Sequence, residues 1–148
     1  MMAAATACLA VVLVLTADFI YARANSAPPA ARAVEIVDGA VRVPLSEVQD
    51  SHLHLFTVKG GGQTLRFMVI KKPNGWGTAL DACQICGAEG YRQDGQNVVC
   101  RHCGSAIYVP SIGEAGGCNP IGVPAHVEGG DLVLDVSSLT QAAAGIPK

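Results

Sequence analysis

Two short cysteine motifs constrain this chain more than any other feature of its 148 residues. They read Cys83-Gln84-Ile85-Cys86-Gly87 and Cys100-Arg101-His102-Cys103-Gly104, and thirteen residues separate Cys86 from Cys100. In a Cys-x-x-Cys-Gly motif the chain turns tightly, so both sulfurs face one point, and the glycine accepts dihedral angles that other residues avoid. Each motif therefore supplies half of a four-thiolate metal site, and the predicted ligands are Cys83, Cys86, Cys100 and Cys103.

The spacing leaves the identity of the metal open. Four thiolates bind zinc, a single iron ion or an iron–sulfur cluster. A zinc ion with a purely structural role is one alternative, and a thiol–disulfide carrier that uses Cys83 and Cys86 is another. Two disulfides are permitted in an oxidising compartment, but bridges within Cys-x-x-Cys are strained. Haem attachment is excluded, because no histidine follows either motif.

Other candidate ligands stand apart from the two motifs. Cys118 lies in a Gly/Pro-rich loop and is a ligand, a spare thiol near the site or a buried apolar filler. We expect it to be dispensable for metal retention, because the motifs already provide four thiolates. His52 and His54 share one face of a predicted strand, where they form either a copper or zinc site or, more commonly, a half-exposed surface. His102 is expected to point away from the metal.

The N-terminal 24 residues predict a membrane anchor. Met1 to Ala17 contains no charged side chain. The length of this run is close to the length that a bilayer helix needs. Ala22-Arg23-Ala24 has the form of a signal-peptidase site, but the basic start of a cleaved signal is missing, which favours an uncleaved anchor. Residues 25–33 form a Pro/Ala linker. The positive-inside rule, taken alone, would place Arg23 and Arg32 in the cytoplasm. We nevertheless expect the domain that follows the anchor to be extracytoplasmic.

Alternating apolar residues and turn signals predict a mostly β domain at residues 34–141, with a flexible tail at 142–148. Asp38-Gly39 predicts a type I′ turn between two strands, and Leu45–Val48 a helical turn. Further strand pairs are expected at 52–58 with 65–71 and at 126–128 with 131–136, and a turn is expected at 73–75. The expected class is an antiparallel β-sandwich or barrel that carries a four-cysteine loop module of the rubredoxin or zinc-ribbon kind, after one transmembrane helix.

Apolar residues are few and scattered between Asp81 and Pro124. The free energy that such a segment gains by burying apolar residues is too small to offset the backbone entropy that it loses when it folds. The cysteine module is therefore expected to depend on its metal for folding.

Charge and composition exclude some classes of function. The formal net charge is −2, and the ten Lys and Arg residues are spread along the chain, so no basic surface for nucleic acid is expected. No nucleophile–base pair or phosphate-binding loop is visible. An electron carrier is therefore expected, and not an enzyme that converts an organic substrate.

The cysteine region resembles the family of membrane iron–sulfur proteins called FtrD-like. The resemblance rests on the runs Asp81–Gly87, Val98–Gly104, Gly116–Pro120 and Gly129–Val133. It implies an iron–sulfur centre and electron transfer in a bacterial ferrous-iron uptake system. The implied partners are the membrane, an iron permease and a periplasmic iron- or copper-binding protein. In that family the cysteine domain often follows several membrane helices, and this chain would retain just one. We therefore expect an inner-membrane location with a single span and an extracytoplasmic C-terminal domain.

A more distant similarity links the chain to Rieske domains. Those domains have two ligand loops, a Gly/Pro-rich loop that covers the cluster and a closing β-hairpin, and the same order is found here. The cover corresponds to Gly116–Pro124 and the hairpin to Val127–Val136. Cys86 and Cys103 stand where Rieske proteins have histidines. All-thiolate ligation implies a lower potential without proton coupling.

These inferences predict a membrane-anchored, extracytoplasmic electron-transfer protein with a cysteine-ligated iron or iron–sulfur centre. A structural zinc-binding interaction module and a thiol–disulfide carrier are the alternatives.

Overall fold

The computed structural model describes residues 12–18, 20 and 30–147. Its strands form three sheets whose pairs are antiparallel, except that β1 pairs in parallel with β4. The five-stranded sheet has the order β1 (Arg32–Ala33), β4 (His54–Gly60), β5 (Gln63–Lys72), β6 (Gly75–Cys83) and β10 (Pro120–Gly122). The four-stranded sheet has the order β11 (His126–Glu128), β12 (Asp131–Asp135), β3 (Ala40–Pro44) and β2 (Ile36–Val37). The three-stranded sheet joins β7 (Tyr91–Asp94), β8 (Asn97–Cys100) and β9 (Ala106–Ile107).

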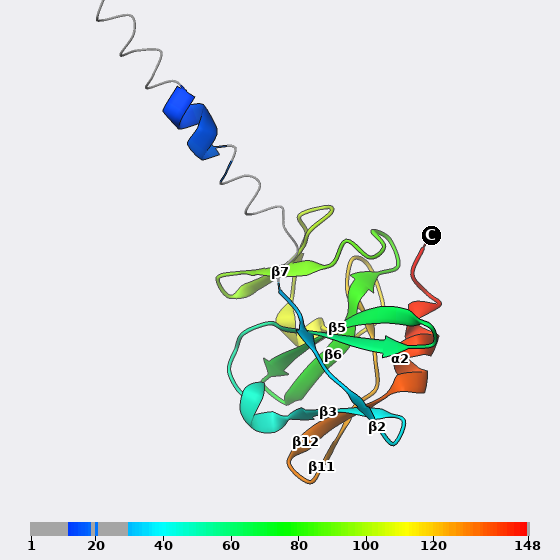
Figure 1. The fold of residues 1–148 in the computed structure, drawn as a ribbon. Helices are drawn as coiled ribbons and strands as arrows, with labels where there is room; N and C mark the ends of the chain where they lie inside the picture. Colours follow the sequence, from blue (N-terminus) through cyan, green and yellow to red (C-terminus); the bar gives the residue numbers. More distant parts are fainter. Residues whose placement is uncertain (1–11, 19, 21–29, 148) are drawn as a thin grey trace, which may run out of the picture.

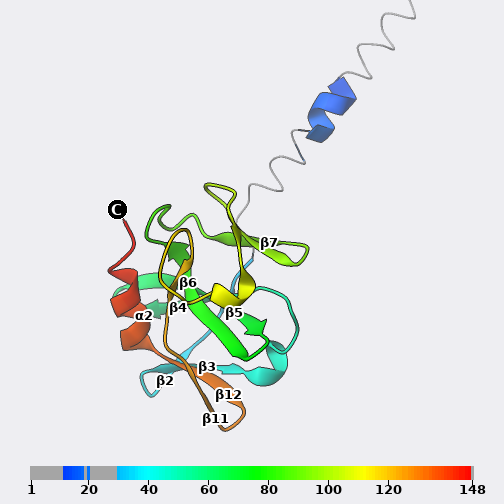
Figure 2. The same ribbon diagram turned by 180° about the vertical axis from the view of Figure 1, so that it is seen from behind.

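The five-stranded sheet is the middle layer of three, as both views of the ribbon show (Figures 1 and 2). Side chains alternate along β5, so that Phe67 and Val69 enter one core while Met68 and Ile70 enter another. The first core lies against the four-stranded sheet and the helix α2 (Val136–Ala143), and includes Val41, Leu134 and Leu139. The second lies against the three-stranded sheet and includes Tyr91, Val98, Cys100, Ile107 and Ile112.

Local turn chemistry explains the hairpins, which confirm the mostly β, antiparallel prediction. Asp38 and Gly39 have φ angles of 51° and 78°, so the predicted turn joins β2 to β3 with Val37 opposite Ala40. The helical turn expected after this hairpin is a 3₁₀ turn, Leu45–Glu47, and a second one spans Val109–Ser111. The pairs β4–β5 and β11–β12 form where alternation predicted them.

Strand β6 was not predicted, because its sequence has little strand propensity. Gly77, Thr78 and Ala79 are small or polar, and an aspartate follows two residues later. The strand forms because β5 and β10 pair with its two edges and both of its faces are covered. A Cβ atom at Gly77 would lie 3.0 Å from Cγ2 of Ile112, so a larger residue there would crowd that side chain.

The predicted faces of the strand at 52–58 were incomplete. The strand begins at His54, and Leu55 and Phe56 are both buried, on opposite faces. Alternation placed Leu55 on one face and Phe56 with the histidines on the other, half-exposed face. The second face is also buried at Phe56, because the middle layer has a core on each side.

The fold extends past both predicted boundaries of the domain. Arg32–Ala33 pairs with β4, and Ala142, Ala143 and Ile146 pack against the first core. With Leu139 these residues recur at helical spacing, so they form the apolar stripe of α2 and the turn after it.

The predicted anchor and linker fall mainly outside the described residues. Residues 12–18 are helical. Within the described part of the chain, no helix is both long and apolar enough to span a bilayer.

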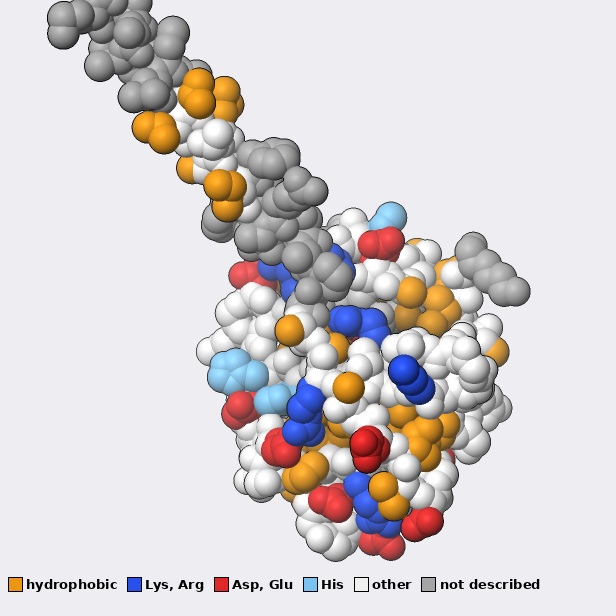
Figure 3. Space-filling view, in the orientation of Figure 1, with side chains coloured by type: hydrophobic (Ala, Val, Ile, Leu, Met, Phe, Trp, Pro, Cys, Tyr) orange, Lys and Arg blue, Asp and Glu red, His pale blue; other side chains and the backbone are white. Residues whose placement is uncertain are grey.

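Acidic and basic side chains are interspersed on the face of the domain shown in Figure 3. Some of them form ion pairs between strands, such as Arg42 with Glu128 at 2.6 Å. Exposed pairs of this kind contribute little to stability.

Gly122, the last residue of β10, should not tolerate a side chain. A Cβ atom there would lie 2.1 Å from the carbonyl oxygen of Gly113, which closes the base of the loop that contains Cys118. Gly122→Ala should therefore lower the free energy of unfolding by about 2–3 kcal/mol in urea titrations. Gly129→Ala is the control, because its φ is 59° but no atom lies within 4 Å of the new Cβ, and it should cost about 1 kcal/mol. Equal costs would show that the contact at Gly122 is absent.

Candidate metal centre

The first cysteine motif starts at Cys83, the last residue of β6. The N–H of Cys83 donates to the carbonyl oxygen of Gly87 (3.1 Å), and the N–H of Gly87 donates back (3.0 Å). Gly87 has a φ of 73°, a left-handed conformation that favours glycine. The N–H of Cys86 points at the Sγ atom of Cys83 at 3.0 Å. A backbone donor in this position stabilises a thiolate.

The second motif repeats this arrangement at the end of β8. The N–H of Gly104 donates to the carbonyl oxygen of Cys100 at 3.0 Å, and the φ of Gly104 is 74°. The Sγ atom of Cys103 lies 3.1 Å from the Oγ atom of Ser105. Both motifs therefore adopt the tight turns that their sequences predicted.

A buried carboxylate sets the two motifs relative to each other. Asp81 precedes Cys83 by two residues on β6 and accepts hydrogen bonds from Arg66 (2.9 Å) and from the N–H of Tyr91 (2.8 Å). Tyr91 begins β7 and lies opposite Cys100 in the β7–β8 pair. The contact between Asp81 and Tyr91 thus connects the strand of the first motif to the hairpin of the second.

Cys118 comes to the same place on a third loop. The Oη atom of Tyr91 donates to the carbonyl oxygen of Cys118 at 2.6 Å. Two residues later, Pro120 lies opposite Cys83 in the β10–β6 pair. The loop is therefore attached to the strand and the hairpin that carry the motifs.

The five sulfur atoms form two overlapping groups of three. The sulfurs of Cys83, Cys86 and Cys100 all lie within 4.8 Å of one another, and so do those of Cys86, Cys103 and Cys118. Three of the four predicted ligands thus lie in one group, and the fourth, Cys103, lies with Cys118 in the second group, which shares Cys86 with the first. Cys83 and Cys100 are 1% and 2% exposed, whereas Cys103 is exposed, so one side of the cluster faces the core and the other faces solvent.

The thiols of the cluster lie close enough to change one another's pKa values. Burial opposes the ionisation of Cys83, yet hydrogen bonds from the N–H groups of Cys86 and Ile85 hold its pKa below the usual value. Loss of hydration and hydrogen bonds with neighbouring thiols raise the pKa of Cys86. The hydrogen bond with Ser105 lowers the pKa of Cys103 to about 6. Without a cation, thiolate charge is thus confined to some of the sulfurs.

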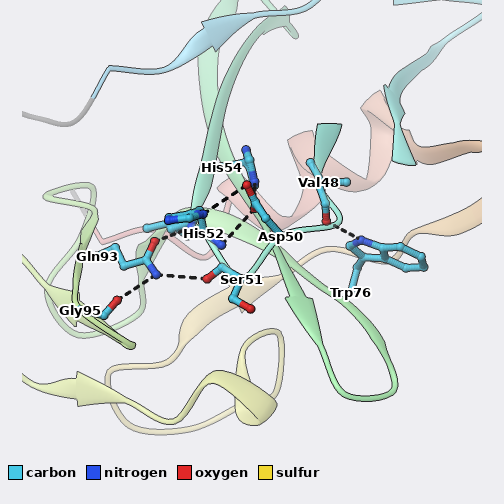
Figure 4. A network of polar contacts seen from close by, with 9 residues as sticks. Val48, Asp50, Ser51, His52, His54, Trp76, Gln93 and Gly95 are labelled. Carbon is cyan, nitrogen blue, oxygen red and sulfur yellow. Dashed lines mark hydrogen bonds and ion pairs between the residues drawn. The ribbon is translucent and has the colours of Figure 1, made fainter. Parts of the chain in front are cut away.

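His52, in the loop before β4, and His54, the first residue of β4, lie apart from the cysteines and both contact Asp50 (Figure 4). The Nε2 atom of His54 is 2.6 Å and the Nδ1 atom of His52 is 3.2 Å from the two carboxylate oxygens of Asp50. Hydrogen bonds with His54 and with the N–H of His52 lower the pKa of Asp50 to about 2. Gln93 joins this loop to β7, because its amide accepts from the N–H of Leu53 at 2.7 Å. In the described part of the chain, only the two cysteine groups bring three potential metal ligands within 4.8 Å.

The comparisons with known proteins agree with this cluster. The sequence model of the family described as membrane iron-sulfur containing protein FtrD-like matches residues 48–145. The chain belongs to the FtrD-like family. Neither a curated protein nor a solved structure matches it. The FtrD-like match spans the five cysteines from Cys83 to Cys118, so the resemblance inferred from their motifs is confirmed.

The donor set fits the group that the FtrD-like description names. All five candidate ligands are soft sulfur atoms, which suit iron–sulfur clusters, iron and zinc, and a backbone N–H already faces one of them. Sequence reasoning missed Asp81 and Tyr91, which position the motifs. A lone aspartate in an apolar run two residues before a cysteine was the only signal for Asp81.

The structure changes the expected dependence of this region on metal. The sequence suggested too few apolar residues between Asp81 and Pro124, but Tyr91, Val98 and Ile112 are fully buried in the second core. The strands of the region therefore have packing of their own, and we expect only the loops that carry sulfur to depend mainly on ligation.

Replacing Asp81 should weaken the fold much more than replacing an exposed aspartate. Asp81→Asn removes the charge that faces Arg66 and should lower the free energy of unfolding by about 2–3 kcal/mol. Asp94→Asn is the control, because its ion pair with Arg92 is exposed (3.2 Å) and should contribute about 0.5 kcal/mol or less. Urea unfolding of both variants measures the difference. Equal effects would mean that Asp81 does not hold the two motifs together.

Loss of a buried ligand should loosen the loops and leave the strands intact. In Cys100→Ser, amide hydrogen exchange should become fast at 84–90, 101–105 and 113–119 but stay slow in β6 and β8. Hydrogen exchange measured by mass spectrometry tests this, with chelator-treated wild-type protein as the control. Fast exchange throughout β7, β8 and β9 would show that the second core depends on metal.

Proposed function

We propose that this FtrD-like protein is a membrane-anchored, extracytoplasmic electron carrier with a cysteine-ligated iron or iron–sulfur centre. The observation that carries the proposal is the cluster of five sulfurs on three loops, in a chain whose family is described as membrane iron–sulfur proteins. When bound, such a centre supplies a one-electron couple. The protein's own residues provide the ligands and separate the inner sulfurs from water.

The motif cysteines are the proposed ligands: Cys83, Cys86, Cys100 and Cys103. The buried positions of Cys83 and Cys100 support an inner side that is shielded from water, which favours a stable centre. The arrangement is proposed to be Rieske-like. Its support is the order of two cysteine loops, a Gly/Pro-rich loop and a closing hairpin, β11–β12.

The cellular setting belongs to the same proposal. The family description supports an association with membranes, and the charge-free run from Met1 to Ala17 supports a single N-terminal anchor in the inner membrane. An iron permease and a periplasmic iron- or copper-binding protein are the proposed partners in iron uptake. Electron exchange with them would require no catalysis on an organic substrate.

Visible spectroscopy of protein purified anaerobically from membranes tests the proposal. An iron or iron–sulfur centre should give charge-transfer absorption that bleaches when dithionite is added. Cys83→Ser should lose this absorption, while Cys8→Ser, which changes a cysteine far from both motifs in the sequence, should keep it. A colourless protein that releases zinc would support the structural module instead. A metal-free protein with a reversible disulfide would support the thiol–disulfide carrier, and mature protein that starts at Asn25 would exclude the anchor.

A further inference from the structure

The sulfur cluster contains one more thiol than a single tetrahedral metal ion uses. Metal–sulfur bonds of about 2.3 Å place the sulfurs of a tetrahedral site roughly 3.8 Å apart. Each group of three has its sulfurs within 4.8 Å of one another, so each is close to the size of one metal position. The five sulfurs thus separate into two positions, and Cys86 belongs to both.

Cys118 is held beside the other sulfurs by several independent contacts. Its Sγ atom lies 3.5 Å from that of Cys103, and its carbonyl oxygen accepts the hydrogen bond from Tyr91. On its C-terminal side, Ser111 donates to the side-chain oxygen of Asn119 at 3.2 Å. The β10–β6 pair begins at the next residue, Pro120. These contacts fix the position of the Cys118 thiol, just as the tight turns of the two motifs fix the positions of their thiols.

The loop before Cys118 has the conformation of a third ligand loop. Gly116 and Gly117 have φ angles of 121° and 56°, and the N–H of Asn119 donates to the carbonyl oxygen of Gly116 at 3.1 Å. The chain therefore turns tightly around Cys118, as it does around the motif cysteines. The sequence-based expectation that Cys118 is dispensable assumed a loop that merely covers the centre, and these contacts remove that assumption.

We propose that the centre has two metal positions that share the thiolate of Cys86. The inner position uses Cys83, Cys86 and Cys100, and the outer position uses Cys86, Cys103 and Cys118. The inference rests on the proposed function in that both positions belong to one thiolate centre. The ions that these two positions would bind are thiophilic divalent ions such as ferrous iron, zinc or cobalt, because all the donor atoms are sulfur.

Each position keeps room for one ligand that the chain does not provide. Three thiolates leave one place of a tetrahedron open. The outer position would lie on the solvent side of the cluster, because Cys103 is exposed. The shared thiolate keeps the two ions near each other, so that their electrons interact.

Titration of the reduced, metal-free full-length chain with cobalt(II) tests the proposal. Wild-type protein should bind about two ions per chain, and Cys118→Ser about one. The second ion should weaken the paramagnetic resonance signal of the first, because the shared sulfur couples them. Cys118→Ser should therefore keep the full signal of one ion. Cys8→Ser is the matched control and should bind as wild type does, and circular dichroism checks that each variant is folded.

The outcomes separate this inference from the proposed function. If wild-type protein and Cys118→Ser both saturate at one ion, the outer position does not exist, although a thiolate centre does. If Cys118→Ser binds no cobalt while folded, the two-position arrangement is wrong, because the inner position should remain. If the wild-type protein binds two ions that do not affect each other's signal, Cys86 is not shared. If it binds no cobalt at all, the proposed metal centre itself fails.

Discussion

The burial of β6 on both faces is the constraint on which the rest of the structure depends. Every residue from Gly77 to Cys83 is buried, so the strand must satisfy its backbone through β5 and β10 and its one carboxylate through a partner. Arg66 and the N–H of Tyr91 meet that requirement at Asp81. Because the same strand ends in Cys83, the need to satisfy one buried charge also fixes the position of the sulfur cluster.

Features that depend on neighbouring residues could be predicted from the sequence. The Asp38-Gly39 turn, the hairpins and the tight turns of both cysteine motifs follow from backbone preferences that operate over a few residues. The family was also identifiable, because the spacing of the cysteines is itself local information.

Features that depend on distant contacts could not be predicted in this way. Strand β6 has the composition of a loop and becomes a strand only because a sheet forms on either side of it. Likewise, the place of Cys118 depends on Tyr91, which is 27 residues away in sequence, and on the β10–β6 pair. Neither contact leaves a periodic pattern in the sequence.

The cluster also links the energetics of the fold to the proposed chemistry. Five thiols in two overlapping groups cannot all ionise without a cation, since each thiolate raises the cost of the next. Loss of hydration, hydrogen bonds with neighbouring thiols and the charge of Cys100 all raise the pKa of Cys86. A bound metal removes that conflict by binding the deprotonated sulfurs. The hydrogen bonds to Cys83 and the pairing of β10 with β6 are formed by the chain itself. The protein therefore positions the sulfurs through its backbone and leaves the metal to offset their mutual repulsion.

The two sides of the cluster differ in a way that suits an electron carrier. Cys83 and Cys100 face the second core, where apolar residues exclude water and would screen a charge change at a bound metal only weakly. Cys103 is exposed, and Ile85 within the first motif is 65% exposed, so the side of the loops offers both a short path to the metal and an apolar contact. For the proposed role, partners would meet the domain at these loops, because the opposite side of the cluster is separated from solvent by the middle sheet and the layer beyond it.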